Sequence, residues 1–392
     1  MNIIPVDSKH KIRSKNVVEE IDSVIDKLVK CFEARLDSAE ASEKGVDINT
    51  DDIMMRHSTD LVFTCFYRQS NLIDYKLKKE PYSRLLDKGL NSGLHPAIQL
   101  ACSMPIFRPI LDWLIGFHLM GKGRNMIMEF MELQTKFHSR AKQQMAKAKQ
   151  EGIAFDPDDF TLKDGTIFKR NMIDPFIDSY HDGKITKEEY LNSSFILFIA
   201  GTKTTADAIS RMLYHLATHK DIQVKLRKAI LKDGLESEYL GWCINESLRL
   251  EPPVAAGCSR RAEKDIEIEG GYVIPKGTLL MTPAHTIHKL PEYWGEDAEE
   301  YKPERWQDAD KFHPLQFMAF GAGRRGCPGR EFALFELRKV LFALLTRFRF
   351  DRCAKTSDLK LINSPCFAYA IFCVPTYLRV SRVSPEDDGL KI

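Results

Sequence analysis

Residues 320–329, FGAGRRGCPG, place a single cysteine in a glycine-rich loop directly before an amphipathic helix. The four glycines of this loop let the backbone approach a bulky, flat group closely. Amide groups at the start of the helix favour a negative sulfur, so Cys327 has the setting of a thiolate. Arg325 supplies a positive charge for an anionic group on whatever the thiolate binds. The alternative is a buried cysteine in a helix-capping loop, and this segment alone does not decide between the two.

The same loop resembles a known cofactor site. Its residues match F-x-x-G-x-R-x-C-x-G, the haem-binding loop of the cytochrome P450 family. At average residue usage, five fixed positions recur by chance in on the order of one chain in ten thousand. Three further segments resemble the family in the expected order: AGTKTT at 200–205, ESLR at 246–249 and PERW at 303–306. The sequence is therefore identified as a member of this family from its start to about residue 383.

The distribution of apolar residues predicts a mainly α-helical chain with a small β-sheet region. Over residues 1–250, apolar side chains recur at spacings of three and four, which is typical of amphipathic helices. Over 251–392, alternating apolar and polar residues with frequent Gly and Pro indicate a strand-rich corner. The same region also contains the cysteine loop and the helix that follows it. No repeat of fixed period is visible, so we expect one large domain over residues 1–392. The resemblance implies the cytochrome P450 fold lacking its N-terminal helices and strands.

Three local patterns precede the central helix. A basic amphipathic helix is predicted at about 122–150, followed by a polar linker at 151–183. Thr186 and Glu189 have the spacing of a capping box, in which each side chain bonds the backbone of the other. They open a helix that is apolar on nearly all sides, so we expect that helix to lie buried.

Net charge and hydropathy exclude two classes of protein. The 57 Lys and Arg residues against 55 Asp and Glu leave a net charge of +2, too balanced for a general nucleic-acid binder. No apolar run of about eighteen residues occurs, so no transmembrane anchor is predicted within this chain. Residues 95–121 are the most apolar stretch, either a buried loop-and-helix pair or a surface that makes a peripheral membrane contact. The resemblance implies the cytosolic face of the endoplasmic reticulum membrane.

One part of the family pattern is absent. Members carry W-x-x-x-R, whose tryptophan and arginine bind a haem propionate, but none of the four tryptophans here is followed four places later by arginine. We therefore expect the chain to begin just after that segment, as a fragment or a shortened gene product. A truncated chain that cannot hold haem is consequently one functional alternative.

Glu246, Arg249 and Arg305 are predicted to form a network. Glu246 and Arg249 lie one helical turn apart, and on a surface such a pair contributes only about 0.3 kcal/mol. With Arg305 added, one carboxylate is shared by two guanidinium groups, which suits a rigid support behind the cysteine loop. In the family this trio is structural, and we expect the same role here.

Gly201 and Thr204 are the predicted catalytic residues of the central helix. The resemblance implies that Gly201 leaves room for haem and dioxygen, and that the Thr204 hydroxyl holds a water or bonds the distal oxygen. The alternative for Thr204 is a bond back to the carbonyl four residues earlier, common in buried helices. Lys203 departs from the family, which usually has Asp or Glu there to relay protons. A lysine can do so only if burial lowers its pKa.

The resemblance implies further contacts with cofactor and substrate. Arg260 corresponds to an arginine that contacts a haem propionate, although a surface arginine, or an exchange of roles with Arg261, is an equal alternative. Besides Cys327 and Arg325, the predicted cofactor-binding residues are Arg260, Phe320, Gly323, Gly329 and Ala200. The predicted substrate contacts are small or apolar and favour a hydrophobic substrate: Ile196, Val254, Ala255, Ala256 and Phe367.

The implied function is that of a haem-thiolate monooxygenase of the EC 1.14 type. Haem b ligated by Cys327 would place one atom of dioxygen into a hydrophobic small molecule, using electrons from NADPH. The expected partner is an NADPH-cytochrome reductase or a ferredoxin-type donor, and no nucleic acid is expected. Two alternatives stay open. One is a haem-thiolate isomerase or dehydratase acting on peroxides, which Lys203 suggests and Thr204 argues against. The other is the inert truncated chain.

Overall fold

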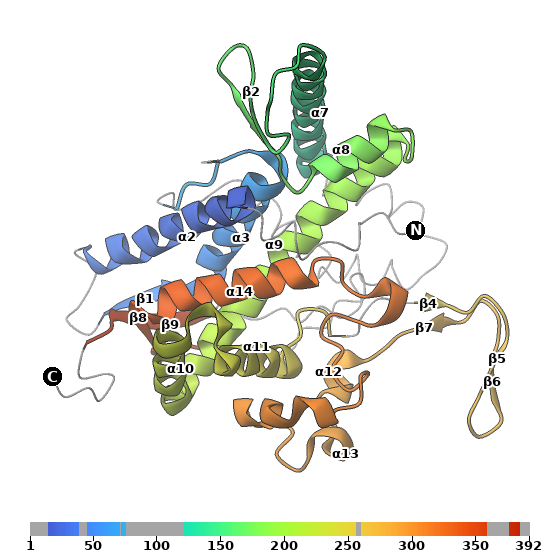
Figure 1. Cartoon of the computed structure of the whole chain (residues 1–392). Helices are drawn as coiled ribbons and strands as arrows, with labels where there is room; N and C mark the ends of the chain where they lie inside the picture. Colours follow the sequence, from blue (N-terminus) through green and yellow to red (C-terminus); the bar gives the residue numbers. More distant parts are fainter. Residues whose placement is uncertain are drawn as a thin grey trace. The chain divides into compact units, whose positions relative to one another are not determined.

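The computed structural model describes residues 15–38, 45–70, 72–75, 121–255, 260–358 and 376–384. Within them the chain is mainly helical with small antiparallel sheets, which confirms the predicted fold class (Figure 1). The chain groups into two compact units, each drawn from separate stretches of sequence. Unit 1 comprises residues 1–42, 52–206 and 331–336, and unit 2 comprises 43–51, 207–330 and 337–392. The expectation of one domain over the whole chain stays a prediction.

Unit 1 is built mainly from helices. α2 (Lys15–Leu36) buries the apolar stripe that its spacing of three and four predicts. In α3 (Thr50–Tyr67), Phe63 stacks on Phe198 of α9 (Lys187–Thr218), with ring centroids 5.3 Å apart. Lys27 of α2 reaches the fully buried Asp60 of α3 at 3.1 Å, so an ion pair joins the two helices.

The central helix α9 starts where the sequence predicts. The Thr186 amide donates to Glu189 Oε2 at 2.9 Å and the Glu189 amide donates to Thr186 Oγ1 at 3.2 Å, which confirms the capping box. The prediction that the whole helix is buried is wrong for its first half, where Ile196 is 59% exposed. From Thr205 to Ala217 every residue is buried, so the apolar composition reflects burial only in the second half.

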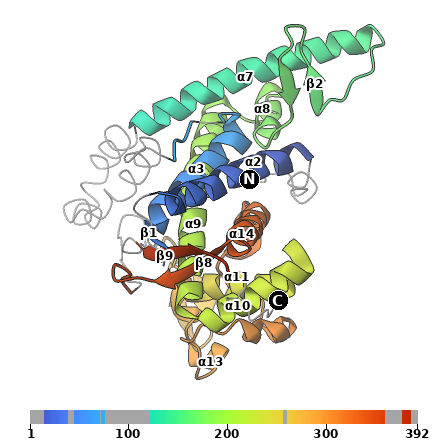
Figure 2. The same cartoon turned by 90° about the vertical axis from the view of Figure 1, so that its left-hand side faces the viewer.

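The predicted helix near 122–150 is α7 (Gly121–Gln150), but the linker after it is structured. Residues 151–183 contain an antiparallel hairpin of β2 (Asp159–Thr161) and β3 (Ile167–Lys169), and then α8 (Asp174–His181). Figures 1 and 2 both show this hairpin beside α7, where Leu162 and Phe168 form one apolar cluster with Ala141 and Met145. The linker prediction is wrong because only one face of a two-stranded hairpin is covered, so alternate residues stay polar.

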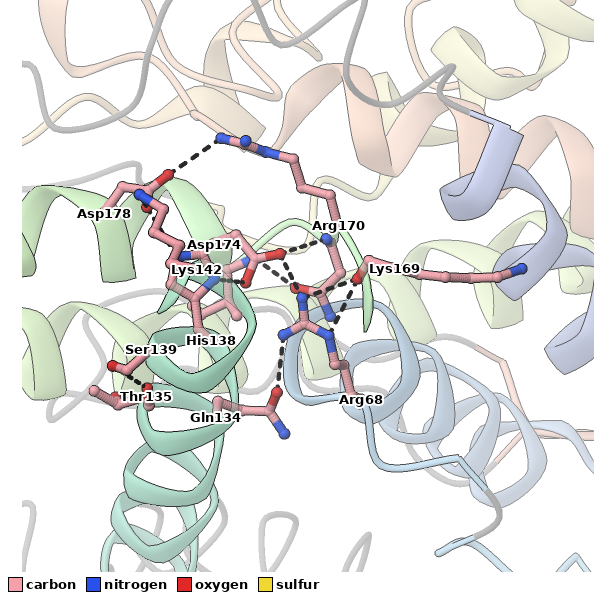
Figure 3. Close-up of polar contacts among 12 residues, drawn as sticks. Arg68, Gln134, Thr135, His138, Ser139, Lys142, Lys169, Arg170, Asp174 and Asp178 are labelled. Atoms are coloured by element: carbon pink, nitrogen blue, oxygen red, sulfur yellow. Dashed lines mark hydrogen bonds and ion pairs between the residues drawn. The ribbon is translucent and has the colours of Figure 1, made fainter. Parts of the chain in front are cut away.

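A group of charged side chains connects the middle of α7 with α8, β3 and the end of α3 (Figure 3). His138 of α7 is 2% exposed and lies between two carboxylates of α8, with Nδ1 3.1 Å from Asp174 Oδ1 and Nε2 2.8 Å from Asp178 Oδ1. Burial by itself lowers the pKa of His138, but the bonds to Asp174 and Asp178 outweigh burial and raise it. The structure therefore favours an imidazolium that donates from Nε2 to Asp178 and forms an ion pair with Asp174.

Arg68 completes this group from the end of α3. It forms an ion pair with Asp174 and donates from NH1 to Gln134 Oε1 at 2.9 Å and from NH2 to the Lys169 carbonyl at 3.0 Å. Its guanidinium also lies over the Phe168 ring at 5.1 Å. Arg68 has a φ of 49°, a left-handed conformation that costs energy for an arginine. These contacts hold it there and join α3, α7, β3 and α8.

Unit 2 contains the remaining strands and the helices around the cysteine loop. Its three-stranded antiparallel sheet has the order β1–β9–β8, with β1 at Val46–Asn49, β8 at Phe348–Arg352 and β9 at Tyr377–Arg382. Two smaller antiparallel pairs are β4 (Arg260–Arg261) with β7 (Leu279–Leu280), and β5 (Ile266–Ile268) with β6 (Tyr272–Ile274). The helical elements are α10 (Lys220–Asp233), η3 (Gly234–Glu236), α11 (Glu238–Leu250), α12 (Ala284–Ile287), α13 (Pro291–Trp294), η4 (Pro303–Lys311), η5 (Gly323–Arg325) and α14 (Arg330–Leu345). Helices α9 and α14 contribute residues to both units.

Candidate functional site

The loop around Cys327 is closed by its own backbone. The Cys327 amide donates to the Phe320 carbonyl at 2.7 Å, and the Gly321 amide donates to the Met318 carbonyl at 2.9 Å. Between these bonds, Gly321 and Gly323 have φ values of 67° and 65°, which side chains larger than hydrogen rarely adopt. These two glycines are therefore required by the turn itself, and the loop is short and rigid.

The thiol of Cys327 is exposed, three residues before Arg330, the first residue of α14. By contrast Cys65 and Cys243 are buried, and burial raises the pKa of each thiol. The alternative of a buried cysteine in a capping loop is thus wrong for Cys327. The positive end of the α14 helix dipole favours the thiolate there.

Basic side chains accompany the thiol. Arg325 is exposed at the end of η5, two residues before the cysteine. The guanidinium of Arg330 lies over the half-buried Phe320 ring at 5.9 Å, and a Cβ built on Gly329 would be 3.9 Å from the Cys327 sulfur. The loop thus presents one sulfur in a cationic environment, with little protein bulk beside that sulfur.

Glu246 of α11 is the centre of the network that the sequence predicts. Its fully buried carboxylate accepts five hydrogen bonds of 2.8 to 2.9 Å. Three come from the predicted partners, which are Arg249 Nε, Arg249 NH2 and Arg305 Nε. The other two come from the Lys302 amide and from Trp306 Nε1. The structure therefore brings the trio together and adds two donors.

The two arginines carry this network into the backbone. Arg249 NH1 donates to the carbonyls of His288 and Ala298, each at 2.6 Å. Arg305 donates to the Trp294 carbonyl at 3.0 Å and the Asp297 carbonyl at 2.9 Å. A buried ion network whose polar groups are satisfied specifies one arrangement of the chain. The backbone of residues 288–306 is therefore fixed in one conformation against α11.

Sequence reasoning missed several members of this network, notably His288, Trp294 and Trp306. Trp306 does lie inside the PERW motif, but the motif alone does not show that its indole bonds to Glu246 at 2.9 Å. Trp294 packs against Trp306. The Arg249 guanidinium carbon lies over the Trp294 ring, 5.0 Å from the ring centroid. Composition offered a partial signal, because two of the four tryptophans fall within thirteen residues here.

On α9, in unit 1, the predicted oxygen-binding residues have local partners. Thr204 Oγ1 donates to the Ala200 carbonyl at 2.6 Å, the bond that the sequence analysis gives as the alternative. A Cβ built on Gly201 would lie 3.2 Å from Val62 of α3, so close helix packing suffices to explain this glycine. The role of Gly201 and Thr204 at the cofactor stays a prediction.

The remaining predicted residues are dispersed. Arg260 is exposed on β4, as is its neighbour Arg261, which donates to the Gly277 carbonyl at 2.7 Å. Val254 is 36% exposed and Ala255 is buried. Ala256 and Phe367 lie outside the described residues, as do residues 95–120 of the stretch predicted to contact a membrane. In the described part of the chain, no helix combines the length and apolar character needed to cross a bilayer.

The donor set at Cys327 fits haem better than a bare metal ion. Within the ranges that the structure describes, no three or more His, Cys, Asp or Glu side chains gather as metal ligands do. A structural zinc site needs about four protein ligands, whereas haem iron is held by its porphyrin and takes one axial protein ligand. A single exposed sulfur in a glycine-rich, cationic loop meets that requirement.

Comparisons with known proteins show the family of this chain. The family model described as Cytochrome P450 matches residues 7–371. Cytochrome P450 3A29 of Sus scrofa is 38% identical over 191 residues, which cover 45% of this chain and 37% of that protein. Cytochrome P450 3A5 of Homo sapiens is 29% identical over 340 residues, 82% of this chain and 62% of that protein. The chain thus spans less than two thirds of the length of these relatives. Because the family model covers most of the sequence, including the Cys327 loop and the Glu246 network, the chain belongs to the cytochrome P450 family.

Proposed function

We propose that this protein is a haem-thiolate monooxygenase of the EC 1.14 type that acts on a hydrophobic small molecule. The observation that carries the proposal is the exposed Cys327 thiol just before α14. The segment that leads into the Cys327 loop is bonded to the Glu246 network through Arg305. The electrons would come from NADPH through an NADPH-cytochrome reductase or a ferredoxin-type donor. We place the protein on the cytosolic face of the endoplasmic reticulum membrane, with residues 95–121 as a peripheral contact.

Cys327 and its neighbours would hold the cofactor. Bound haem b would supply an iron centre for dioxygen activation, and a thiolate ligand from Cys327 would favour cleavage of the O–O bond. As the ligand of that iron, the Cys327 sulfur would be deprotonated. Arg325 and Arg260 are exposed cations that suit the anionic propionates. Phe320, Gly323 and Gly329 would keep the loop close to the porphyrin.

On the oxygen-binding side, Thr204 and Gly201 are proposed to act from α9. The Thr204 hydroxyl donates its hydrogen to the Ala200 carbonyl, so its oxygen can accept a hydrogen bond from a water. That water would bring a proton to the site. Ile196 is exposed on the same helix one turn earlier than Ala200. The family resemblance implies Ile196 and Val254 as apolar substrate contacts, and we keep each as a proposal.

A carbon monoxide difference spectrum tests the ligand. Protein expressed with added hemin should show, when reduced, the Soret band position that thiolate ligation produces. Cys327→Ser should abolish that band, because a serine hydroxyl does not replace an anionic sulfur. Cys353→Ser, at a half-buried cysteine elsewhere, is the matched control and should leave the band unchanged. A colourless wild-type protein would refute the proposal and favour an inert chain that does not hold haem.

Lys203 favours a second candidate, a haem-thiolate isomerase or dehydratase that rearranges peroxides. This residue replaces the usual acid, and the Thr204 hydroxyl already has a partner in the Ala200 carbonyl. Such an enzyme consumes neither NADPH nor dioxygen. Substrate-dependent NADPH oxidation in the presence of a reductase supports the monooxygenase. Turnover of an added hydroperoxide without NADPH consumption supports the second candidate.

A further inference from the structure

His288 lies between the Glu246 network and the cysteine loop. It follows α12 directly and is fully buried. Its Nδ1 is 2.9 Å from the Arg249 carbonyl oxygen, and its Nε2 is 2.8 Å from the Met318 amide. The Arg249 guanidinium donates in return to the His288 carbonyl at 2.6 Å. Two residues far apart in sequence are thereby joined by two hydrogen bonds.

The partners determine which imidazole nitrogen carries the hydrogen. A backbone amide can only donate, so Nε2 must accept from Met318. Nδ1 therefore carries the hydrogen and donates to the Arg249 carbonyl. Burial lowers the pKa of His288 to about 4, which agrees with a neutral ring. The ring also stacks on Phe317, with centroids 5.4 Å apart.

The hydrogen bond to Met318 continues into the cysteine loop. The Met318 carbonyl accepts from the Gly321 amide at 2.9 Å, and the neighbouring Phe320 carbonyl accepts from the Cys327 amide at 2.7 Å. The network on α11 is thus connected, through one imidazole, to the turn that carries the sulfur. All of these residues belong to unit 2.

We propose that His288 is a positioning residue that sets the orientation of the Cys327 loop from the Glu246–Arg249 network. The spectroscopic part of this inference rests on the proposed haem-thiolate function. A histidine suits the position because one small ring donates on one side, accepts on the other and packs through its apolar face. Phenylalanine keeps the ring and loses both bonds, whereas glutamine has a donor and an acceptor and can keep both.

The first measurement compares His288→Phe, His288→Gln and His285→Phe after expression with hemin. His285 lies one turn earlier on α12, and its side chain makes no hydrogen bond within the described residues, so His285→Phe is the control. In His288→Phe, the ratio of thiolate-ligated to other haem in the reduced carbon monoxide spectrum should fall about tenfold. That factor corresponds to about 1.4 kcal/mol, near the lower end of the effect of leaving a donor unsatisfied, which suits the half-buried Met318 amide. His288→Gln should restore the ratio to within about threefold of wild type.

The second measurement does not depend on haem. Hydrogen exchange of peptides covering residues 318–327 in the purified full chain should be about tenfold faster in His288→Phe than in wild type. Exchange in α10 should not change, which separates a local effect from general unfolding. Equal exchange in wild type and His288→Phe would overturn the inference, as would a glutamine variant that behaves like phenylalanine. Wild-type protein without haem would refute the proposed function alone, because the exchange result still decides the role of His288.

Discussion

Replacing Glu246 by glutamine changes one oxygen of the central carboxylate into an NH2 group and leaves the shape of the side chain intact. In the wild type, Oε1 accepts from Arg249 NH2, the Lys302 amide and Arg305 Nε. Oε2 accepts from Arg249 Nε and Trp306 Nε1. Whichever way the amide is turned, its NH2 group faces at least two donors, and the charge that balances two guanidinium groups is gone.

The expected loss of unfolding free energy in Glu246→Gln follows from these hydrogen bonds. Hydrogen bonds to a charged group contribute about 1.5–3 kcal/mol each, so two lost bonds cost about 3–6 kcal/mol. A second, independent basis gives a similar value, because removing one partner of a buried ion pair costs about 3–5 kcal/mol. Because Glu246 is fully buried, solvent does not screen or replace these interactions. We therefore expect Glu246→Gln to lose about 4 kcal/mol of unfolding free energy, a large share of the ~5–15 kcal/mol typical of a domain.

Urea unfolding at neutral pH, followed by far-UV circular dichroism, measures this loss. Glu304→Gln is the matched control, since Glu304 bonds Lys225 at 2.6 Å and Tyr239 at 3.0 Å but is 40% exposed as a side chain. The control should lose less than about 1 kcal/mol. If Glu246→Gln loses no more than Glu304→Gln, the buried network does not hold unit 2 together and the reasoning fails.

Three further predictions concern stability. Burial raises the pKa of Glu336 to about 8 from 4.5, so stability falls as the pH rises from 4.5 to 8. In urea titrations, Glu336→Gln should gain about 1.4 kcal/mol per pH unit over wild type in that interval, and a constant difference contradicts this. The raised pKa of His138 contributes stability that is present below about pH 6.5 and lost as the pH rises through the raised value. His138→Phe should therefore flatten the fall in unfolding free energy as the pH rises above about 6.5, whereas a slope equal to that of wild type counts against the imidazolium. A Cβ on Gly45, which has a φ of 102°, would lie 2.2 Å from the Val380 carbonyl oxygen. Gly45→Ala should lose about 3 kcal/mol or more, against about 1 kcal/mol for the control Gly152→Ala, where the φ is 72° and no atom lies within 4 Å. Equal losses in the two variants would show that the clash is relieved.

Local sequence patterns predicted the features that depend on near neighbours in the chain. The capping box at Thr186 and Glu189 and the buried stripe of α2 follow from spacing within one helix. The Cys327 loop was recognisable because its glycines, its arginine and its cysteine lie within ten residues. The same reasoning failed at 151–183, since a short hairpin with one covered face has no long apolar run to mark it. It also gave Gly201 a role at the cofactor without knowledge of Val62, which lies far away in sequence.

The sequence by itself determined the helical class of the chain, its family and the identity of the candidate ligand sulfur, because each depends on residue types at short, fixed spacings. Only the tertiary structure decided that Cys327 is exposed, that Glu246 accepts five hydrogen bonds and that His288 joins this network to the loop. Burial and hydrogen-bond partners depend on which distant segments the fold brings within about 3 Å of one another. No spacing along the chain encodes that proximity, so residues 246, 288 and 318 become connected only after folding.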